Sequence, residues 1–132
     1  MILIDSNVLL DLYDVGSEWH QWSVGALAAA ADEAPLMIDP IIYAEVSIKF
    51  KTPVEFDEAF PPEDFLRQDL PFAAAFIAGK AHTEYRRRGG VRAATLPDFF
   101  IGAHALVAGY RILTRDPRRF RRYFPTVEVI AP

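Results

Sequence analysis

The stretch MILIDSNVLLDL, residues 1–12, decides the fold because it joins two kinds of local pattern. Residues 1–4 form a short apolar run that suits a buried strand. From residue 7 to about residue 15, the apolar side chains recur at helical spacing. A buried strand that passes directly into a helix is typical of an α/β protein. It also places the carboxylate of Asp5 at the end of a core strand, where charged groups are rare.

The remainder of the chain repeats this alternation of strands and helices. We expect further strands at residues 36–39, 111–114 and 127–130. Prolines and small polar residues mark the expected helices: one with Ser17 as its N-cap, others over 40–49, 71–88 and 97–108, and short helical segments that begin near residues 53, 62 and 117. This order predicts a parallel sheet of four to five strands with helices on both faces. Functional residues in such sheets gather at the carboxyl ends of the strands.

Length and composition limit the classes of protein to consider. The chain has 132 residues, of which 52 % are hydrophobic and 24 % are charged, so we expect a single globular domain over residues 1–132. It has no cysteine, which excludes disulfides and thiolate metal sites. No apolar run approaches the roughly 20 residues that cross a bilayer, and Asp5 would interrupt a signal peptide. These features make the cytoplasm the expected location and a membrane an unexpected partner.

The net charge of −4 conceals two halves of opposite sign. Residues 1–66 carry 13 acidic residues and two lysines, whereas residues 67–132 carry 12 basic residues and five acidic ones. An ordinary solvated surface would account for this asymmetry, and so would a cation site beside a track for a polyanion.

Nine of the 14 basic residues lie in two segments, RRRGGVR (86–92) and RDPRRFRR (115–122). The second segment spreads its arginines around a helix, so only some of them can face a nucleic acid. Arg115, Arg118 and Arg119 are the predicted contacts to an RNA backbone. No aromatic platform for stacking bases is evident in the sequence.

Three more acidic residues occupy positions equivalent to that of Asp5. Glu45 lies in the helix after the second strand, Asp98 in the first turn of a later helix, and Asp116 directly after the third strand. Each has a simpler explanation when taken alone. Asp5 could cap its helix, and Glu45 could pair with Lys49. Asp98 and Asp116 could interact with helix dipoles. Four acids at equivalent junctions of one α/β chain favour a shared site instead.

Four converging carboxylates would repel one another and resist burial unless a cation neutralised them. Oxygen ligands favour a hard ion such as Mg²⁺ or Mn²⁺. One ion could polarise a phosphate oxygen and activate a water, and two ions would form the clamp that many nucleases use. We therefore predict that Asp5, Glu45, Asp98 and Asp116 are the catalytic residues and hold one or two divalent ions.

Other polar residues in apolar surroundings rank lower as ligands. Asp39 also ends a strand, but it directly precedes a proline. Asp11 and Asp14 are expected on the solvated side of the first helix. His104 lies in the apolar stretch IGAHALV, six residues beyond Asp98 and off that residue's helical face. It is predicted to be a hydrogen-bonded core residue and not a metal ligand.

The chain resembles the PIN-domain nucleases, and within them the VapC toxins of toxin–antitoxin pairs, in five ordered segments: MILIDSNVLLDL, PIIYAEV, LPDFFIGAHAL, ILTRDPRRF and YFPTVEVIAP. The resemblance implies a three-layer α/β/α sandwich and Mg²⁺- or Mn²⁺-dependent endoribonuclease activity. It also implies homodimers and inhibition by a cognate VapB-like antitoxin. The acidic positions of the family fall on Asp5, Glu45, Asp98 and Asp116.

Smaller features of the family also find counterparts. Its hydroxyl-plus-asparagine pattern falls on Ser6 and Asn7, with Ser where Thr is commoner, and its Thr near the last acid falls on Thr114. These three side chains are predicted to orient ligands or waters. The stretch FKTPVEFDEAFPPEDF (50–65) matches the family least. A comparable helical hairpin helps these toxins to hold the antitoxin, but packing of the four phenylalanines into the core is an equal alternative.

Two other classes of function stay open at this point. A metal-dependent phosphohydrolase or a DNA nuclease would use the same carboxylate site. A non-catalytic PIN-like binding module would use these acids only for structure. No pair of histidines is placed for general acid–base cleavage through the ribose 2′-hydroxyl, which favours hydrolysis by a metal-activated water.

Overall fold

A computed structural model of the chain describes residues 1–90 and 96–132. The elements in these residues are, in chain order, β1 (Ile2–Ile4), α1 (Ser6–Tyr13), α2 (His20–Glu33), β2 (Leu36–Ile38), α3 (Pro40–Ser47), α4 (Pro53–Ala59), β3 (Phe65–Arg67), α5 (Phe72–Arg87), α6 (Leu96–Ala108), β4 (Arg111–Leu113), α7 (Arg118–Tyr123) and β5 (Val129–Ile130). No helix in these residues is long and apolar enough to cross a membrane.

The five strands form one parallel sheet in the order β3-β2-β1-β4-β5. Strand β1 is central, and its Ile2 lies opposite Leu36 of β2 on one side and Arg111 of β4 on the other. The chain builds the sheet outward from β1 to β3 and then returns to add β4 and β5 on the opposite side. Strand order therefore reverses between β1 and β4, and ligands of α/β sheets bind at the carboxyl ends of strands beside such a point.

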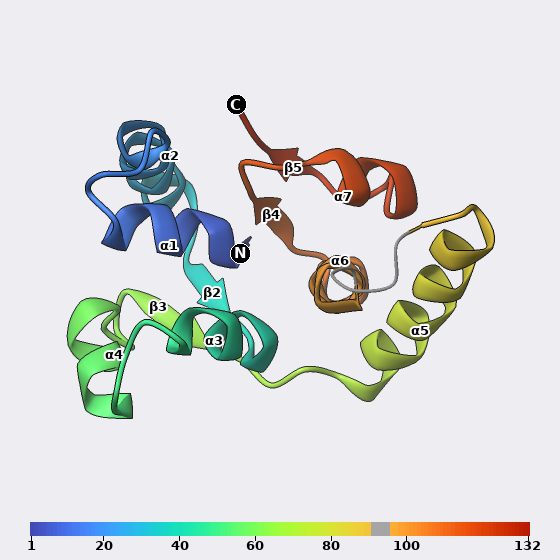
Figure 1. The fold of residues 1–132 in the computed structure, drawn as a ribbon, viewed down its shortest axis with the longest axis horizontal. Helices are drawn as coiled ribbons and strands as arrows, with labels where there is room; N and C mark the ends of the chain where they lie inside the picture. The colour runs from blue at the N-terminus through green and yellow to red at the C-terminus, as the bar shows by residue number, and fades with distance from the viewer. Residues whose placement is uncertain (91–95) are drawn as a thin grey trace.

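Helices cover both faces of the sheet, as the sequence predicted. Figure 1 shows α1 and α2 on one side of the sheet and α5 and α6 on the other. Helix α3 contacts both α1 and α6, and α7 packs against α6. The architecture is the predicted three-layer α/β/α arrangement.

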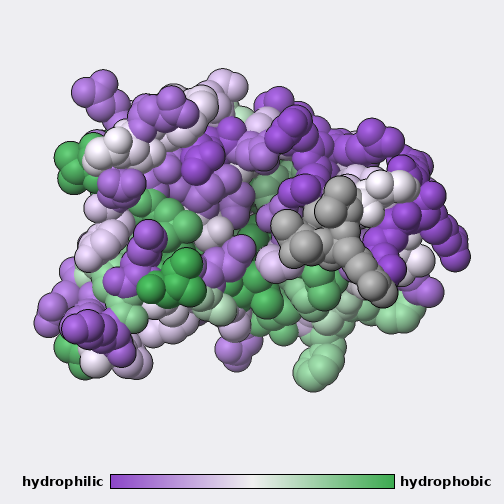
Figure 2. All heavy atoms as spheres, in the orientation of Figure 1, coloured by the Kyte–Doolittle hydropathy of each residue, from purple (hydrophilic) through white to green (hydrophobic). Residues whose placement is uncertain are grey.

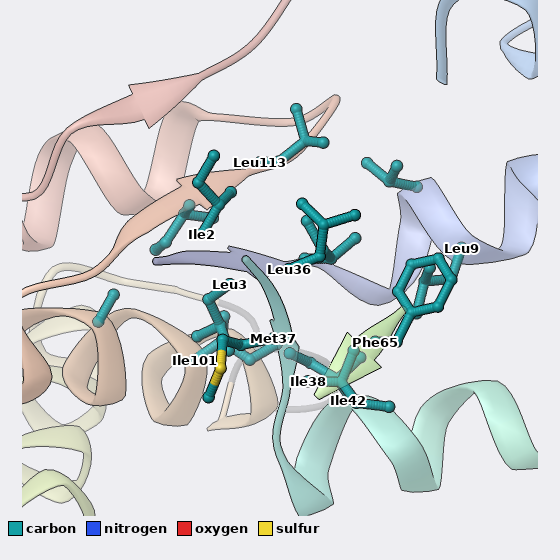
Figure 3. Close-up of a cluster of buried hydrophobic side chains, with 14 of the residues drawn as sticks. Ile2, Leu3, Leu9, Leu36, Met37, Ile38, Ile42, Phe65, Ile101 and Leu113 are labelled. Carbon is teal, nitrogen blue, oxygen red and sulfur yellow. The ribbon is translucent and has the colours of Figure 1, made fainter. Parts of the chain in front are cut away.

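The core lies on both sides of β1, whose three residues are fully buried. Leu3 lies beside Met37 of β2 and Ile101 of α6, and Ile38 and Ile42 continue the same apolar layer (Figure 3). An apolar strand buried on both faces is what a central parallel strand requires. It holds the residues that follow it, beginning with Asp5, in a fixed place.

Two predicted elements differ in the structure. The helical segment expected near residue 62 is wrong, because the chain turns over Pro61–Asp64 and then pairs with β2 as β3. This pairing gives hydrogen-bond partners to an edge that β2 would otherwise leave open. Helix α2 begins at His20, not directly after Ser17. The Ser17 hydroxyl instead donates to Asp11 and accepts from the backbone N–H of Trp19, which holds a turn before the helix.

The phenylalanines of residues 50–65 pack with one another. Phe56, Phe60 and Phe65 are buried, and Phe50 is half-buried against them. The Phe56 and Phe60 ring centroids lie 5.5 Å apart, and Phe65 meets Phe60 at 5.5 Å in an edge-on arrangement. Packing into the core, the alternative considered for this stretch, is therefore confirmed for these side chains.

Candidate active site

Asp5 stands at the junction of β1 and α1 and is 4 % exposed. It occupies the N-cap position of α1, but its side chain makes no capping hydrogen bond. The hydroxyl of Thr114 donates to its Oδ2 at 2.8 Å, and the Ser6 hydroxyl lies 3.5 Å from its Oδ1. The simpler explanation, that Asp5 only caps the helix, does not describe this side chain.

Thr114 ties the end of β4 to the end of β1. Its hydroxyl donates to Asp5 and accepts from the Asn7 amide at 3.2 Å and from the backbone N–H of Asp116 at 3.1 Å. The backbone N–H of Asp5 also donates to the carbonyl of Leu113 at 2.9 Å. One buried threonine thus orients Asp5, Asn7 and the start of the segment that carries Asp116.

Glu45 reaches the same region from α3. The hydroxyl of Ser6 donates to its Oε1 at 3.0 Å, so Ser6 lies between the carboxylates of Asp5 and Glu45. Among the described residues, no ion pair joins Glu45 to Lys49, the alternative partner that helical spacing offered. The Glu45 carboxylate therefore accepts a long-range hydrogen bond from Ser6 instead of pairing with Lys49.

Asp98 and Asp116 are held by arginines of α7. Arg119 donates from Nη1 to Asp98 Oδ2 at 2.7 Å. Arg118 donates to both oxygens of Asp116, at 3.0 and 3.2 Å. A cavity of about 280 Å³ opens between these pairs and is lined by Asp5, Asn7, Tyr85, Asp98, Asp116, Arg118, Arg119 and Phe120. Glu45 is not in this lining set.

Burial raises the pKa of three of the four acids. Burial raises the pKa of Asp5 from an ordinary 3.8 to about 7 against the Thr114 hydrogen bond, and the charges of Asp98 and Glu45 add to the rise. Burial also raises the pKa of Glu45 and that of Asp98, although hydrogen bonds from Ser6 and Arg119 favour the ionised forms. The negative charge of neighbouring carboxylates therefore adds to the effect of burial on these pKa values.

Asp116 behaves in the opposite way because it is more exposed. Hydrogen bonds from Arg118 hold the pKa of Asp116 below its usual range. Three carboxylates of the site thus resist ionisation, whereas an arginine stabilises the ionised form of the fourth, Asp116.

The chemistry of these donors fits a hard divalent cation. The acceptors that meet here are carboxylate and hydroxyl oxygens, which Mg²⁺ and Mn²⁺ prefer. As the side chains are placed, no three acidic or histidine residues in the described part of the chain are grouped closely enough to hold a metal ion. Arg118 and Arg119 donate hydrogen bonds to the carboxylates of Asp116 and Asp98. A cation would therefore compete with these arginines for the carboxylate oxygens.

Comparison with known protein families gives a match to the PIN domain over residues 2–124. The chain belongs to the PIN domain family. A comparison with curated proteins finds no match. The resemblance to PIN domains drawn from the sequence is therefore confirmed, and the observed α/β/α arrangement is that of the family.

Solved structures with a similar fold include chains from toxin–antitoxin complexes. VapBC2 from Rickettsia felis, bound to a DNA fragment from its promoter, has a TM-score of 0.74 at 18 % identity over 100 % of this chain and 99 % of that one. VapBC-1 from nontypeable Haemophilus influenzae has a TM-score of 0.73 at 16 % identity over 99 % and 98 %. A toxin–antitoxin complex from Klebsiella pneumoniae has a TM-score of 0.68 at 23 % identity over 98 % and 96 %. These similarities establish the fold.

Arg115, one of the three predicted RNA contacts, has an internal partner in this PIN domain. Its guanidinium donates to Asp11 Oδ2 at 2.7 Å, and Asp11 is 4 % exposed. The expectation that Asp11 is solvated is wrong, because Ser17 and Ser23 also donate to its carboxylate. Helical spacing alone placed Asp11 away from the apolar face of its helix. In the structure, α2 and the segment after β4 cover that side of the helix. The other two predicted contacts, Arg118 and Arg119, line the cavity.

His104 and Asp39 form a buried pair that the sequence analysis did not connect. His104 is a core residue, as predicted, and its Nδ1 lies 2.9 Å from Asp39 Oδ2. The other oxygen of Asp39 accepts from the backbone N–H groups of Ile41 and Ile42 and caps α3. The signal was the sequence Asp-Pro at a helix start, which is a capping pattern. This pair joins α6, which carries Asp98, to α3, which carries Glu45.

Proposed function

We propose that this PIN domain is a VapC-like toxin that hydrolyses internal phosphodiester bonds of RNA with Mg²⁺ or Mn²⁺ as cofactor. The observation that carries the proposal is the buried carboxylate of Asp5 within the electrostatic influence of Asp98 and Glu45. A protein gains nothing in stability from burying coupled acids, and a bound cation is the chemistry that makes such a group useful. Membership of the PIN family supports the same reading.

In this proposal Asp5, Glu45, Asp98 and Asp116 hold the cation. When bound, a divalent ion supplies positive charge that polarises a phosphate oxygen and lowers the pKa of a water. Thr114 fixes the orientation of the Asp5 carboxylate through Oδ2, and Ser6 does the same for Glu45. Asn7 holds the Thr114 hydroxyl in place. These neutral donors orient the acids without adding a competing charge.

Arg118 and Arg119 have a second role in the proposed reaction. They lie on the wall of the carboxylate cavity, where an RNA phosphate would approach the acids. If Asp98 and Asp116 held a cation, the guanidinium groups of Arg119 and Arg118 would be available to bind phosphate oxygens. The RNA phosphate would then have the cation on one side and the two guanidinium groups on the other.

We further propose that a cognate VapB-like antitoxin restrains the activity and that the toxin is a homodimer. The similar solved structures named above are toxin–antitoxin complexes, which supports the first part. Co-purification with the product of a small open reading frame upstream of this one would test the antitoxin. Light scattering of the purified toxin would test the dimer.

The central experiment compares three proteins on a total RNA pool, with Mn²⁺ and with EDTA, and maps the cut ends. The proteins are the parent, Asp5→Asn and the control Asp32→Asn, which changes an exposed acid of α2. We expect EDTA-sensitive cleavage by the parent and the control, and none by Asp5→Asn. Cleavage that persists in EDTA, or equal cleavage by Asp5→Asn, would contradict the proposal.

Parallel substrates separate the remaining alternatives. Single-stranded DNA and a small phosphoester are tested at the same metal concentration. Faster hydrolysis of either would favour a DNA nuclease or a phosphohydrolase on the same site. No hydrolysis of any substrate, with no change of melting temperature on adding Mn²⁺, would favour a non-catalytic binding module.

A further inference from the structure

A second cavity adjoins the carboxylate cavity and is lined by arginine and tyrosine. Its volume is about 220 Å³, and its side chains include Tyr85, Arg88, Arg118, Arg119, Arg122 and Tyr123. Tyr85, Arg118 and Arg119 line both cavities, so the two spaces share a wall. Among the residues that the structure describes, no acidic side chain lines the second cavity, which we call the arginine–tyrosine pocket.

The tyrosine rings of this pocket hold the guanidinium groups. Arg88 and Arg122 each lie 5.9 Å from the centre of the Tyr123 ring, and Arg119 lies 5.6 Å from that of Tyr85. The two rings meet edge-on at 6.0 Å. Such contacts orient an arginine while leaving its N–H donors open. The sequence suggested no aromatic platform because Tyr85 and Tyr123 lie 38 residues apart.

Local backbone structure shapes one wall of the pocket. Helix α5 ends at Arg87, and Gly89 follows with a φ of 83°, a conformation that favours glycine. A side chain at position 90 would meet the Tyr85 ring at 2.1 Å, so only glycine lets the chain pass this close. This turn after α5 places Arg88 beside α7. Figure 2 shows hydrophilic side chains gathered over this end of the molecule.

In the part of the chain that the structure describes, Arg88 and Arg122 are not held by buried ion pairs. Arg88 pairs with Glu84 of its own helix, and both side chains are about half exposed. Among the described residues, Arg122 has no carboxylate partner within ion-pair distance. Exposed pairs contribute little stability, so an incoming phosphate can displace them. Four arginines line this small cavity and no acid from the described part of the chain does, which favours a ligand with several negative oxygens.

We propose that the arginine–tyrosine pocket is a subsite for single-stranded RNA, which binds the phosphate next to the one in the carboxylate cavity. The inference rests on the proposed function, because it places the same RNA strand across both cavities. Arg118 and Arg119 lie between the two phosphates, and Arg88 and Arg122 contact the outer one. The outer phosphate is positioned, not cleaved, since no carboxylate of residues 1–90 or 96–132 lines its pocket.

The test measures binding of a short fluorescent single-stranded RNA in EDTA, where no metal-dependent cleavage occurs, over a range of salt concentrations. The double variant Arg88→Gln/Arg122→Gln is compared with Arg86→Gln/Arg121→Gln. Both pairs remove one exposed arginine from the end of α5 and one from α7, so the change in net charge is identical. Arg86 and Arg121 are outside the lining of the pocket.

Loss of the one phosphate that both arginines contact should reduce the slope of log K against log salt by about 0.7 for a single strand. We expect this reduction for Arg88→Gln/Arg122→Gln and little change for the control pair. Equal reductions in both, or none in either, would overturn the subsite. A poly-glutamate peptide bound as tightly as RNA, with the same loss in Arg88→Gln/Arg122→Gln, would also overturn it and point to an acidic protein segment.

Cleavage kinetics separate this proposal from the proposed function. With Mn²⁺, the Arg88→Gln/Arg122→Gln variant should show a raised KM and an unchanged kcat, because the pocket binds the strand away from the reacting phosphate. A lowered kcat with an unchanged KM would contradict the subsite. If the parent itself cleaves no RNA, the proposed function fails, while the salt slopes in EDTA still decide whether the pocket binds RNA.

Discussion

The inner and the outer acids of the candidate site are held in different ways. Asp5 and Glu45, the inner pair, accept hydrogen bonds from the neutral hydroxyls of Thr114 and Ser6. Asp98 and Asp116, the outer pair, are bound by arginines. Asp5 is 4 % exposed, whereas the Asp116 side chain is 47 % exposed. The pKa of Asp5 is raised and that of Asp116 is lowered, although both are aspartates.

This difference shows how one small site separates two tasks. The inner acids are oriented by groups that cannot neutralise them, so their need for positive charge is left for a ligand. The outer acids are paired with arginines, whose side chains are exposed or partly exposed. A cation that enters must displace arginines only from the outer pair. The comparison therefore predicts large effects from inner substitutions and small ones from outer substitutions.

Asp5→Asn should have the largest effect. Loss of one electrostatic donor costs about 10²–10³-fold in rate in other enzymes, and loss of a ligand to the whole cation should exceed about 10³-fold. The amide keeps the size of the side chain, so circular dichroism should show an unchanged fold. Single-turnover cleavage of RNA in Mn²⁺ is the measurement, with Asp32→Asn as the control. A cleavage rate of Asp5→Asn within tenfold of the parent rate would contradict the larger effect expected for the inner acids.

The pH dependence of stability should reveal the buried charge of Asp5. Its pKa is higher in the folded protein, at about 7, than the ordinary 3.8, so the folded state binds the proton more tightly. The stability that this proton contributes is fully present below about pH 4 and is lost as pH rises through about 7. In EDTA, the parent should therefore melt at a lower temperature at pH 8 than at pH 5.

Asp5→Asn should remove much of this decrease because the amide does not ionise. At pH 8 the variant should be more stable than the parent by on the order of 4 kcal/mol, from about three pKa units at about 1.4 kcal/mol each. The difference should become smaller toward pH 5. Asp116, whose pKa is lowered, contributes with the opposite sign, since its stabilisation is lost as pH falls. If the stability of parent and variant changed with pH in the same way, the pKa of Asp5 would be equal in the folded and unfolded states, which would contradict the rise caused by burial.

The sequence was sufficient to predict much of this arrangement. The apolar run before Asp5 and the switch to helical spacing after it predicted the junction, because both are local patterns. The strands at 36–39 and 111–114 and the helices that carry Glu45 and Asp98 followed from the same signals. Strand β3 was not predicted, since its formation depends on pairing with β2 and not on its own residues.

Contacts between distant residues were beyond local patterns. Asp11 looks solvated on a single helix, yet Arg115 and two serines approach it from other elements. The pairing of Arg119 with Asp98 likewise depends on how α7 packs against α6. Gly102 permits that packing, because a side chain there would meet the Phe124 ring at 2.3 Å. Residue types thus indicated which acids matter, and tertiary packing decided which cations face them. The last arginine of the basic segment 86–92, Arg92, lies outside the described residues.

Thr114→Val should have an intermediate effect on the inner pair. Valine has nearly the same shape but cannot donate to Asp5 or accept from Asn7. Partners that orient a metal ligand typically contribute about 10–100-fold to metal affinity or activity. We expect a loss in this range in the Mn²⁺ concentration dependence of cleavage. Thr114→Ser retains the hydroxyl and should restore most of the activity; a serine variant as impaired as valine would indicate a packing role instead.

Arg119→Gln should have a smaller effect with the opposite sign. Without the guanidinium, Asp98 has no internal cation to release, so Mn²⁺ should bind about two- to fivefold more tightly, as expected for a partly exposed ion pair. Calorimetric titration without RNA measures this directly. Binding of RNA should weaken in the same variant. Weaker binding of Mn²⁺ would mean that Arg119 orients Asp98 for the metal and does not compete with it.

Arg118→Gln should have the smallest effect on stability. Its side chain is 86 % exposed, and the pair with Asp116 lies in water, where ion pairs are screened and side-chain entropy opposes them. The urea midpoint should therefore stay within measurement error of the parent. Arg115→Gln is the matched comparison, because it breaks a charged hydrogen bond to the buried Asp11, a kind of bond that contributes about 1.5–3 kcal/mol. If both variants unfold at the same urea concentration, burial does not distinguish the two arginines. If only Arg115→Gln is destabilised, Arg118 is free to exchange its acid for a phosphate at no cost to the fold.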